Sequence, residues 1–139
     1  MEIESLMNVA LDTGGKIDVL WGMFISVHAA VFGFLFFADS RLNFFGASVL
    51  VLIYLSFAYL NYSSLHSSYR LLNAVLMDLN NYFSTHPNGI SKNFQKYLKS
   101  VDVNSMHNSS FLIHASSGIL TMLATCRKAF LDARQNRKE

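Results

Sequence analysis

Three long stretches of the chain are rich in apolar residues and contain no Asp, Glu, Lys or Arg. They cover residues 19–38, 42–69 and 103–126, which is 20, 28 and 24 residues. A bilayer core of roughly 30 Å needs about 20 helical residues to cross it. The stretches are too long for membrane strands and do not alternate apolar with polar positions. The pattern predicts an all-α integral membrane protein with three transmembrane helices.

Turn residues and changes of periodicity set the boundaries of the predicted elements. Apolar positions at helical spacing lie on one face of residues 2–11, and Gly14-Gly15 then predicts the end of that helix. We expect this short segment to lie in the membrane interface. The predicted elements are an interfacial helix at 2–13, transmembrane helices at 17–38, 44–62 and 106–126, an amphipathic helix at 90–102 and a basic tail at 127–139. Together they make one domain.

The second apolar stretch continues into a one-sided helical pattern. Its apolar positions recur at alternating four- and three-residue steps, the spacing of a coiled-coil seam. They are Leu65, Tyr69, Leu72, Leu76, Leu79 and Phe83. We therefore predict one helix over 44–83 that leaves the bilayer, with polar turns at 39–43 and 86–89 on either side. The 90–102 segment is too short to cover six positions, so we expect a partner helix at Leu72 and Leu76.

Composition agrees with a membrane protein and excludes several other classes. Hydrophobic residues make up 52% of the chain and charged residues 14%, below the roughly 25% of soluble domains. A soluble bundle of this composition would lack the polar face that its helices need. The net charge of +2 gives no reason to expect a nucleic-acid partner. Cys126 is the only cysteine, which excludes an intrachain disulfide.

The basic residues favour one orientation in the membrane. Lys and Arg close to a span mark its cytoplasmic side. Three spans put the N-terminus and the 63–105 loop on one side, and the short turn and the tail on the other. Arg127 and Lys128 directly follow the third span, whereas the lysines of the loop lie further from the lipid. We expect the N-terminus outside and the C-terminus inside, in a bacterial inner or plasma membrane.

Two histidines lie inside predicted spans, His28 in the first and His114 in the third. An ionisable residue at membrane depth is costly and is a candidate for function. Facing neutral imidazoles on parallel helices would suit a b-type haem or a metal ion. The alternative, which we favour, is that each imidazole bonds a neighbouring carbonyl or hydroxyl and holds the helices together. We therefore expect no cofactor, with haem b as the alternative.

The third predicted span carries a polar seam. Its members fall within about 80° of one another at 100° per residue. They are Ser110, His114, Ser117, Thr121 and Thr125. Such a seam either packs against other helices or, in a ring of copies, lines a pore. We favour packing.

The first predicted span has a ridge of small residues that lets another backbone approach closely. Gly22, Ser26, Ala29, Ala30 and Gly33 share this face, which we call the α-ridge. His28 projects about 145° away from it at 100° per residue. One helix thus has two faces that disfavour lipid contact. A three-helix bundle covers both only if this helix is central, so we expect a second copy or another protein on one of them.

No catalytic sequence motif occurs, and we do not expect an enzyme. His66, His107 and His114 are candidates for a cluster near one membrane face, although solvated histidines are the expected reading. The function we predict is an accessory or scaffold subunit that assembles with itself or with a larger membrane complex. One alternative is a homo-oligomeric pore or holin-like protein lined by the polar seam. Another is a redox subunit with histidine-ligated haem or metal.

Overall fold

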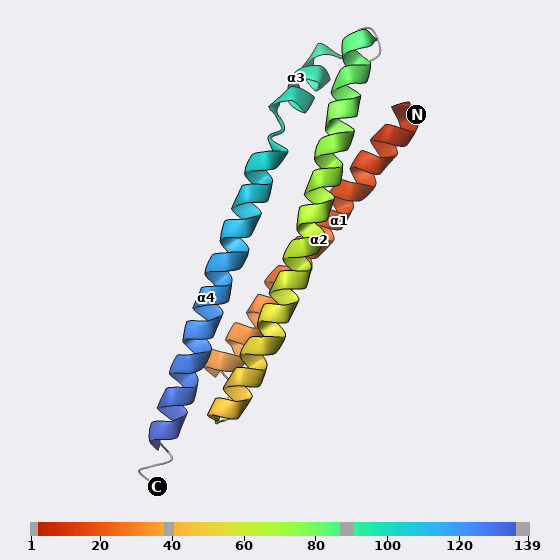
Figure 1. Cartoon of the computed structure of the whole chain (residues 1–139). Coiled ribbons are helices and arrows are strands. Elements are labelled where there is room, and N and C mark those ends of the chain that lie inside the picture. Colours follow the sequence, from red (N-terminus) through yellow and green to blue (C-terminus); the bar gives the residue numbers. More distant parts are fainter. Residues whose placement is uncertain (1–2, 38–40, 87–90, 136–139) are drawn as a thin grey trace. The chain divides into compact units, whose positions relative to one another are not determined.

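The fold consists of four helices and, among the residues described, no strand. The computed structural model describes residues 3–37, 41–86 and 91–135. The helices are α1 (Ile3–Phe37), α2 (Phe44–Thr85), α3 (Lys92–Ser100) and α4 (Val103–Gln135) (Figure 1). Three segments are long and apolar enough to cross a membrane: α1, α2, and the stretch Lys92–Gln135 that contains α4. The predicted all-α class with three such helices is confirmed.

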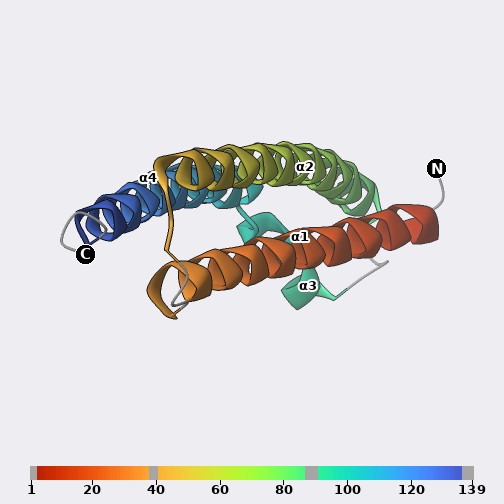
Figure 2. The ribbon, with the colours of Figure 1, turned by 90° about the horizontal axis from the view of Figure 1, so that it is seen from below.

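The chain divides into two units. The first unit comprises residues 1–21 and 63–110, and the second comprises 22–62 and 111–139. The long helices α1, α2 and α4 contribute to both units, whereas α3 belongs to the first. In each unit α1 lies against α2 (Figure 2).

The prediction of one long second helix over 44–83 is confirmed, since α2 runs from Phe44 to Thr85. Asn43 caps its start: its side-chain oxygen accepts a hydrogen bond from the Gly46 amide at 2.7 Å, and its carbonyl accepts one from the Ala47 amide at 2.9 Å. Much of both predicted turns (residues 39–40 and 87–89) lies outside the described residues, as do 136–139 of the predicted basic tail.

The prediction that Gly14-Gly15 ends a separate helix over 2–13 is wrong. Helix α1 passes through both glycines, and no glycine among the described residues has a positive φ. The buried positions Leu6, Thr13 and Ile17 stay on one face across the glycines, because they are spaced by seven and four residues. Packing of this face outweighs the cost of a helical glycine, about 1 kcal/mol each.

In the first unit, the N-terminal part of α1 covers the apolar seam of α2. One cluster joins Leu6 of α1 and Leu98 of α3 to the seam residues Leu79 and Phe83. A second joins Ile17 of α1 and Val103 of α4 to the start of the seam, at Leu65 and Tyr69. The expectation that the seam exceeds what 90–102 can cover is correct, but α1 covers the rest. The seam therefore gives no reason to expect a partner helix.

Leu72 and Leu76, the proposed partner contacts on the seam, are half-buried at the edges of these clusters. Helix α3 lies within the predicted 90–102 segment. Ser91 caps it, its hydroxyl accepting a hydrogen bond from the Phe94 amide at 3.2 Å. Helix α4 starts three residues before the predicted span of 106–126 and continues nine residues beyond it.

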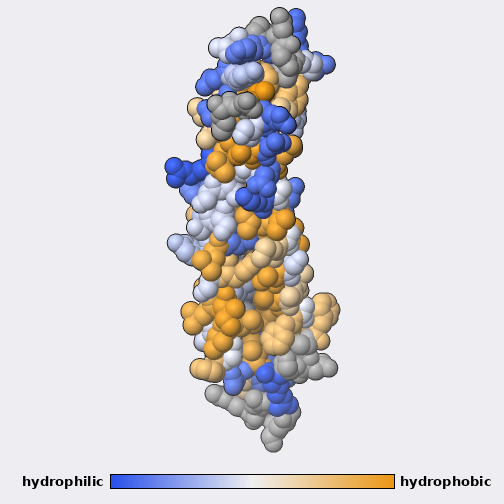
Figure 3. Space-filling view, turned by 90° about the vertical axis from the view of Figure 1, so that its right-hand side faces the viewer, coloured by the Kyte–Doolittle hydropathy of each residue, from blue (hydrophilic) through white to orange (hydrophobic). Residues whose placement is uncertain are grey.

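In the second unit the core is small and the surface is apolar. One cluster holds Leu35 of α1, Ala47 of α2 and Ala129 of α4, together with Leu42 before α2. Many large apolar side chains on the three helices are exposed. Figure 3 shows hydrophobic residues covering most of the face that this unit turns to the viewer. An exposed surface of this kind suits lipid or protein contact better than water.

Candidate functional site

His28 of α1 lies in the second unit with both ring nitrogens bonded. Its Nδ1 is 2.9 Å from the Phe24 carbonyl oxygen, and its Nε2 is 2.5 Å from the Tyr54 hydroxyl on α2. A carbonyl only accepts, so Nδ1 of the neutral imidazole carries the proton and Nε2 accepts from Tyr54. His28 therefore links α1 to α2 through its bond to Tyr54.

His114 of α4 makes a second interhelical bond in this unit. Its Nε2 donates to the side-chain oxygen of Asn61 on α2 at 2.9 Å, and both residues are buried. The Phe24 ring contacts both imidazoles, with centroids 4.1 Å from His28 and 3.8 Å from His114. The two histidines thus meet α2 through Tyr54 and Asn61, and each other through Phe24.

This geometry does not suit haem ligation. An iron atom bound by His28 and His114 needs one unshared nitrogen lone pair from each ring. In His28, Nδ1 is protonated and the Nε2 lone pair accepts from Tyr54. The ring of Phe24 contacts both imidazoles. Haem binding would require Tyr54 and Phe24 to move, so the haem hypothesis stays a prediction without support in the arrangement of these side chains.

The polar seam of α4 is mostly buried. Ser110, in the first unit, and His114, Thr121 and Thr125, in the second, are each at most 6% exposed. Ser117 is half-buried, and its hydroxyl donates to the Ile113 carbonyl at 2.6 Å. Thr125 donates to the Thr121 carbonyl at 2.8 Å. A pore lined by several copies needs this seam exposed, whereas burial within one chain is what helix packing needs.

The α-ridge lies on the uncovered side of α1. Gly22, Ser26, Ala29 and Ala30 are exposed and Gly33 is half-buried. A Cβ atom built on either glycine would meet no atom within 4 Å outside its own helix segment. The buried Phe24 and Leu35 each follow one of these glycines by two residues, about 200° around the helix. Of the two faces of α1, the chain covers the one that carries His28.

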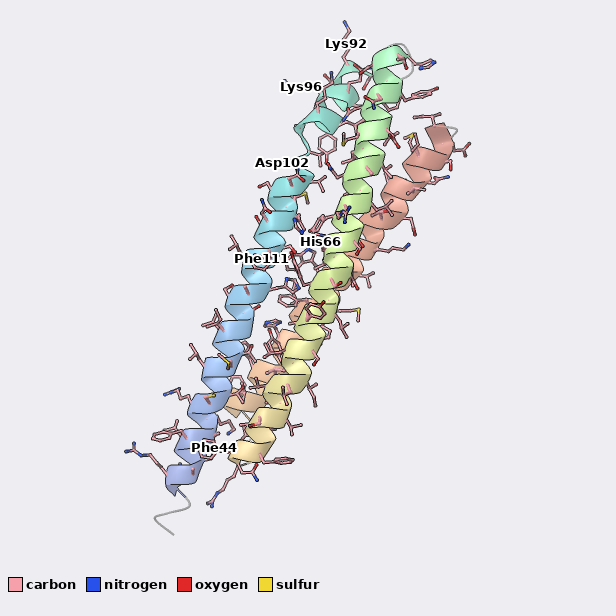
Figure 4. All side chains as sticks on the ribbon, viewed as in Figure 1. Phe44, His66, Lys92, Lys96, Asp102 and Phe111 are labelled. Atoms are coloured by element: carbon pink, nitrogen blue, oxygen red, sulfur yellow. The ribbon has the colours of Figure 1, made fainter. Side chains whose placement is uncertain are left out.

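The first unit contains a second histidine pair. Nδ1 of His66 on α2, labelled in Figure 4, lies 2.6 Å from Nε2 of His107 on α4. Tyr69 packs edge-on against His107, and its hydroxyl accepts a hydrogen bond from the Trp21 indole at 3.0 Å. No group of three or more His, Cys, Asp or Glu among the described residues could hold a metal ion. The pair acts as a bridge between helices, and His114, the third histidine considered with it, belongs to the other unit.

Sequence reasoning missed the hydrogen-bond partners of the histidines, and it missed Asp132, which links α4 to the start of α2. Asn61 was detectable, as a polar amide within the uncharged stretch 42–69, whereas nothing local marks Tyr54. Asp132 accepts a hydrogen bond from the Leu42 amide at 2.7 Å, and its Oδ2 lies 3.6 Å from Nζ of Lys128. This contact ties the end of α4 to the start of α2, and only the fold reveals it.

Comparison with known proteins yields no relative. No protein family, curated protein or solved structure matches the chain.

Proposed function

We propose that the chain is a multi-pass membrane protein that acts as an accessory or scaffold subunit. The second unit, with the uncharged turns that adjoin it, would lie in the bilayer. The distribution of charge supports this placement. Within the second unit, residues 22–37, 44–62 and 111–126 hold no charged residue. Charged side chains there follow only at the helix ends, where they would reach the headgroups.

The exposed α-ridge is the observation that carries the proposed role. Without a hydrophobic drive between helices in lipid, close backbone approach at small residues is a main source of association. The ridge offers such an approach along α1, from Gly22 to Gly33. The Ser26 hydroxyl donates to the Gly22 carbonyl at 2.8 Å, so it needs no partner outside the helix. The ridge is therefore shaped to receive another helix.

The polar side chains of the second unit support a structural role for the chain itself. His28 bonds Tyr54 and His114 bonds Asn61, both across helices. Such bonds are worth about 0.6 kcal/mol on average in membrane bundles. These bonds would fix the rotation of α1 about its own axis, so that the α-ridge faces away from α2 and α4. The chain then presents one fixed surface to a second copy or to a larger complex.

The test is the mass of the assembly after gentle extraction of the full chain. The proposal predicts a particle heavier than one 15.7 kDa chain, with either further copies or a stoichiometric partner. Gly22→Leu with Gly33→Leu should release the single chain, because added bulk blocks backbone approach. Ile53→Phe is the control, since Ile53 is 65% exposed and lies on α2, not on the ridge. A single chain in the wild type, or an assembly insensitive to the ridge variant, would refute the proposal.

A further inference from the structure

A groove between α1 and α4 in the second unit combines an apolar wall with a basic end. It has a volume of about 510 Å³, within the range of small-ligand pockets. Phe32 and Phe36 of α1 line one side, and Leu120 and Leu123 of α4 line the other. Arg127 and Lys128 line it beyond the last uncharged turn of α4.

The charges at the basic end leave a net positive site. Asp132 also lines the groove, but its Oδ2 accepts from the Leu42 amide and lies 3.6 Å from Lys128 Nζ. Asp132 thus offsets the charge of Lys128, and the exposed Arg127 gives the lining a net charge of +1. Arg134 lies seven residues beyond Arg127, about 20° away around the helix, and adds a second cation on that face.

We infer that this groove binds an anionic phospholipid of the surrounding membrane. The acyl chains would lie along the phenylalanine and leucine walls, and the phosphate would meet Arg127. A guanidinium binds phosphate oxygens through two parallel hydrogen bonds. Complementarity of charge selects this occupant, because a basic pocket between membrane helices favours anionic headgroups. The inference rests on the membrane placement proposed above, and not on the α-ridge.

Native mass spectrometry of the full chain can test lipid binding and assembly in one experiment. The probes are palmitoyl-oleoyl phosphatidylglycerol and phosphatidylcholine, which share acyl chains and differ in net charge. The wild type should retain phosphatidylglycerol preferentially. A cation near an anionic headgroup is worth about 1 kcal/mol, so Arg127→Gln should reduce that preference roughly fivefold. Lys92→Gln, an equal loss of charge at an exposed position of α3, should not change it.

A second pair of variants tests the apolar wall and does not disturb the charges. Leu123→Trp should fill the groove and reduce retention of both lipids, whereas Leu112→Trp, on α4 outside the groove and 65% exposed, should not. Equal retention of the two lipids by the wild type would overturn the inference. So would an Arg127→Gln chain that behaves as the Lys92→Gln control does. The number of protein copies in the same spectra reports separately on the α-ridge proposal.

Discussion

The Tyr54 hydroxyl on α2 donates a hydrogen bond to Nε2 of His28 on α1. Nδ1 of the same imidazole donates a hydrogen bond to the Phe24 carbonyl. Tyr54 is 2% exposed. The bond thus joins a buried tyrosine to a half-buried histidine between two helices. It fixes which face of α1 points inward and, as a result, which face stays exposed.

Removing the Tyr54 hydroxyl should cost more stability than removing an exposed one. Tyr54→Phe removes the hydrogen bond to the half-buried His28, and we expect a loss of about 0.5–1.5 kcal/mol in unfolding free energy. Tyr59→Phe, at a position 70% exposed, should change it by less than about 0.5 kcal/mol. Chemical denaturation in detergent measures both. Equal effects of the two substitutions would show that the His28 bond contributes nothing.

Alanine at the two internal glycines of α1 should stabilise the chain. Both positions are helical, and a Cβ atom at Gly14 or Gly15 would meet no atom within 4 Å outside its own helix segment. Each substitution should add roughly 0.4–1 kcal/mol by restricting the unfolded chain. Gly46→Ala should gain less, because its Cβ would lie 3.1 Å from the capping oxygen of Asn43. Thermal unfolding followed by circular dichroism measures the stability of each variant. Destabilisation by Gly14→Ala would mean that the helix breaks at Gly14.

Two Lys–Asp pairs four residues apart should differ in their contribution to stability. Lys128 and Asp132 are 16% and 15% exposed, and Asp132 also binds the Leu42 amide. Asp132→Ala removes the acceptor of the Leu42 amide and breaks the ion pair with Lys128, so we expect a loss of about 1–3 kcal/mol. Asp12→Ala breaks an exposed pair with Lys16 and should cost about 0.5 kcal/mol or less. The same denaturation assay measures both, and a larger cost for Asp12→Ala would contradict the anchoring role of Asp132.

The single tryptophan reports on the first unit. Its indole nitrogen donates to the Tyr69 hydroxyl at 3.0 Å. Tyr69→Phe should shift the Trp21 emission maximum and lower the unfolding free energy by about 0.5–1.5 kcal/mol, the net value of one hydrogen bond. Tyr97→Phe, at an exposed position on α3, should alter neither signal. An unchanged emission spectrum in Tyr69→Phe would mean that the two side chains do not meet.

Local pattern was enough to predict the three long apolar helices, although not that α1 is continuous from Ile3. The uncharged stretches required helices of bilayer length, because backbone groups in lipid must bond within their own segment. The apolar steps from Leu65 to Phe83 predicted that α2 continues well past the second stretch, and it does. The seam of α4 predicted a buried polar face, and His114, Thr121 and Thr125 are buried. Each of these follows from the spacing of residues within one element.

Tertiary packing decided the rest. Gly14-Gly15 is a local signal to stop a helix, yet contacts of Leu6 and Ile17 with α2 and α3 carry α1 through it. The sequence predicted that both the His28 face and the α-ridge of α1 pack against other helices. The fold covers the first, because Tyr54 and Phe24 meet the imidazole, and leaves the second open. Sequence thus indicated which faces of α1 need cover, and only the tertiary structure decided which of them the chain itself covers, since that depends on residues far apart in the chain.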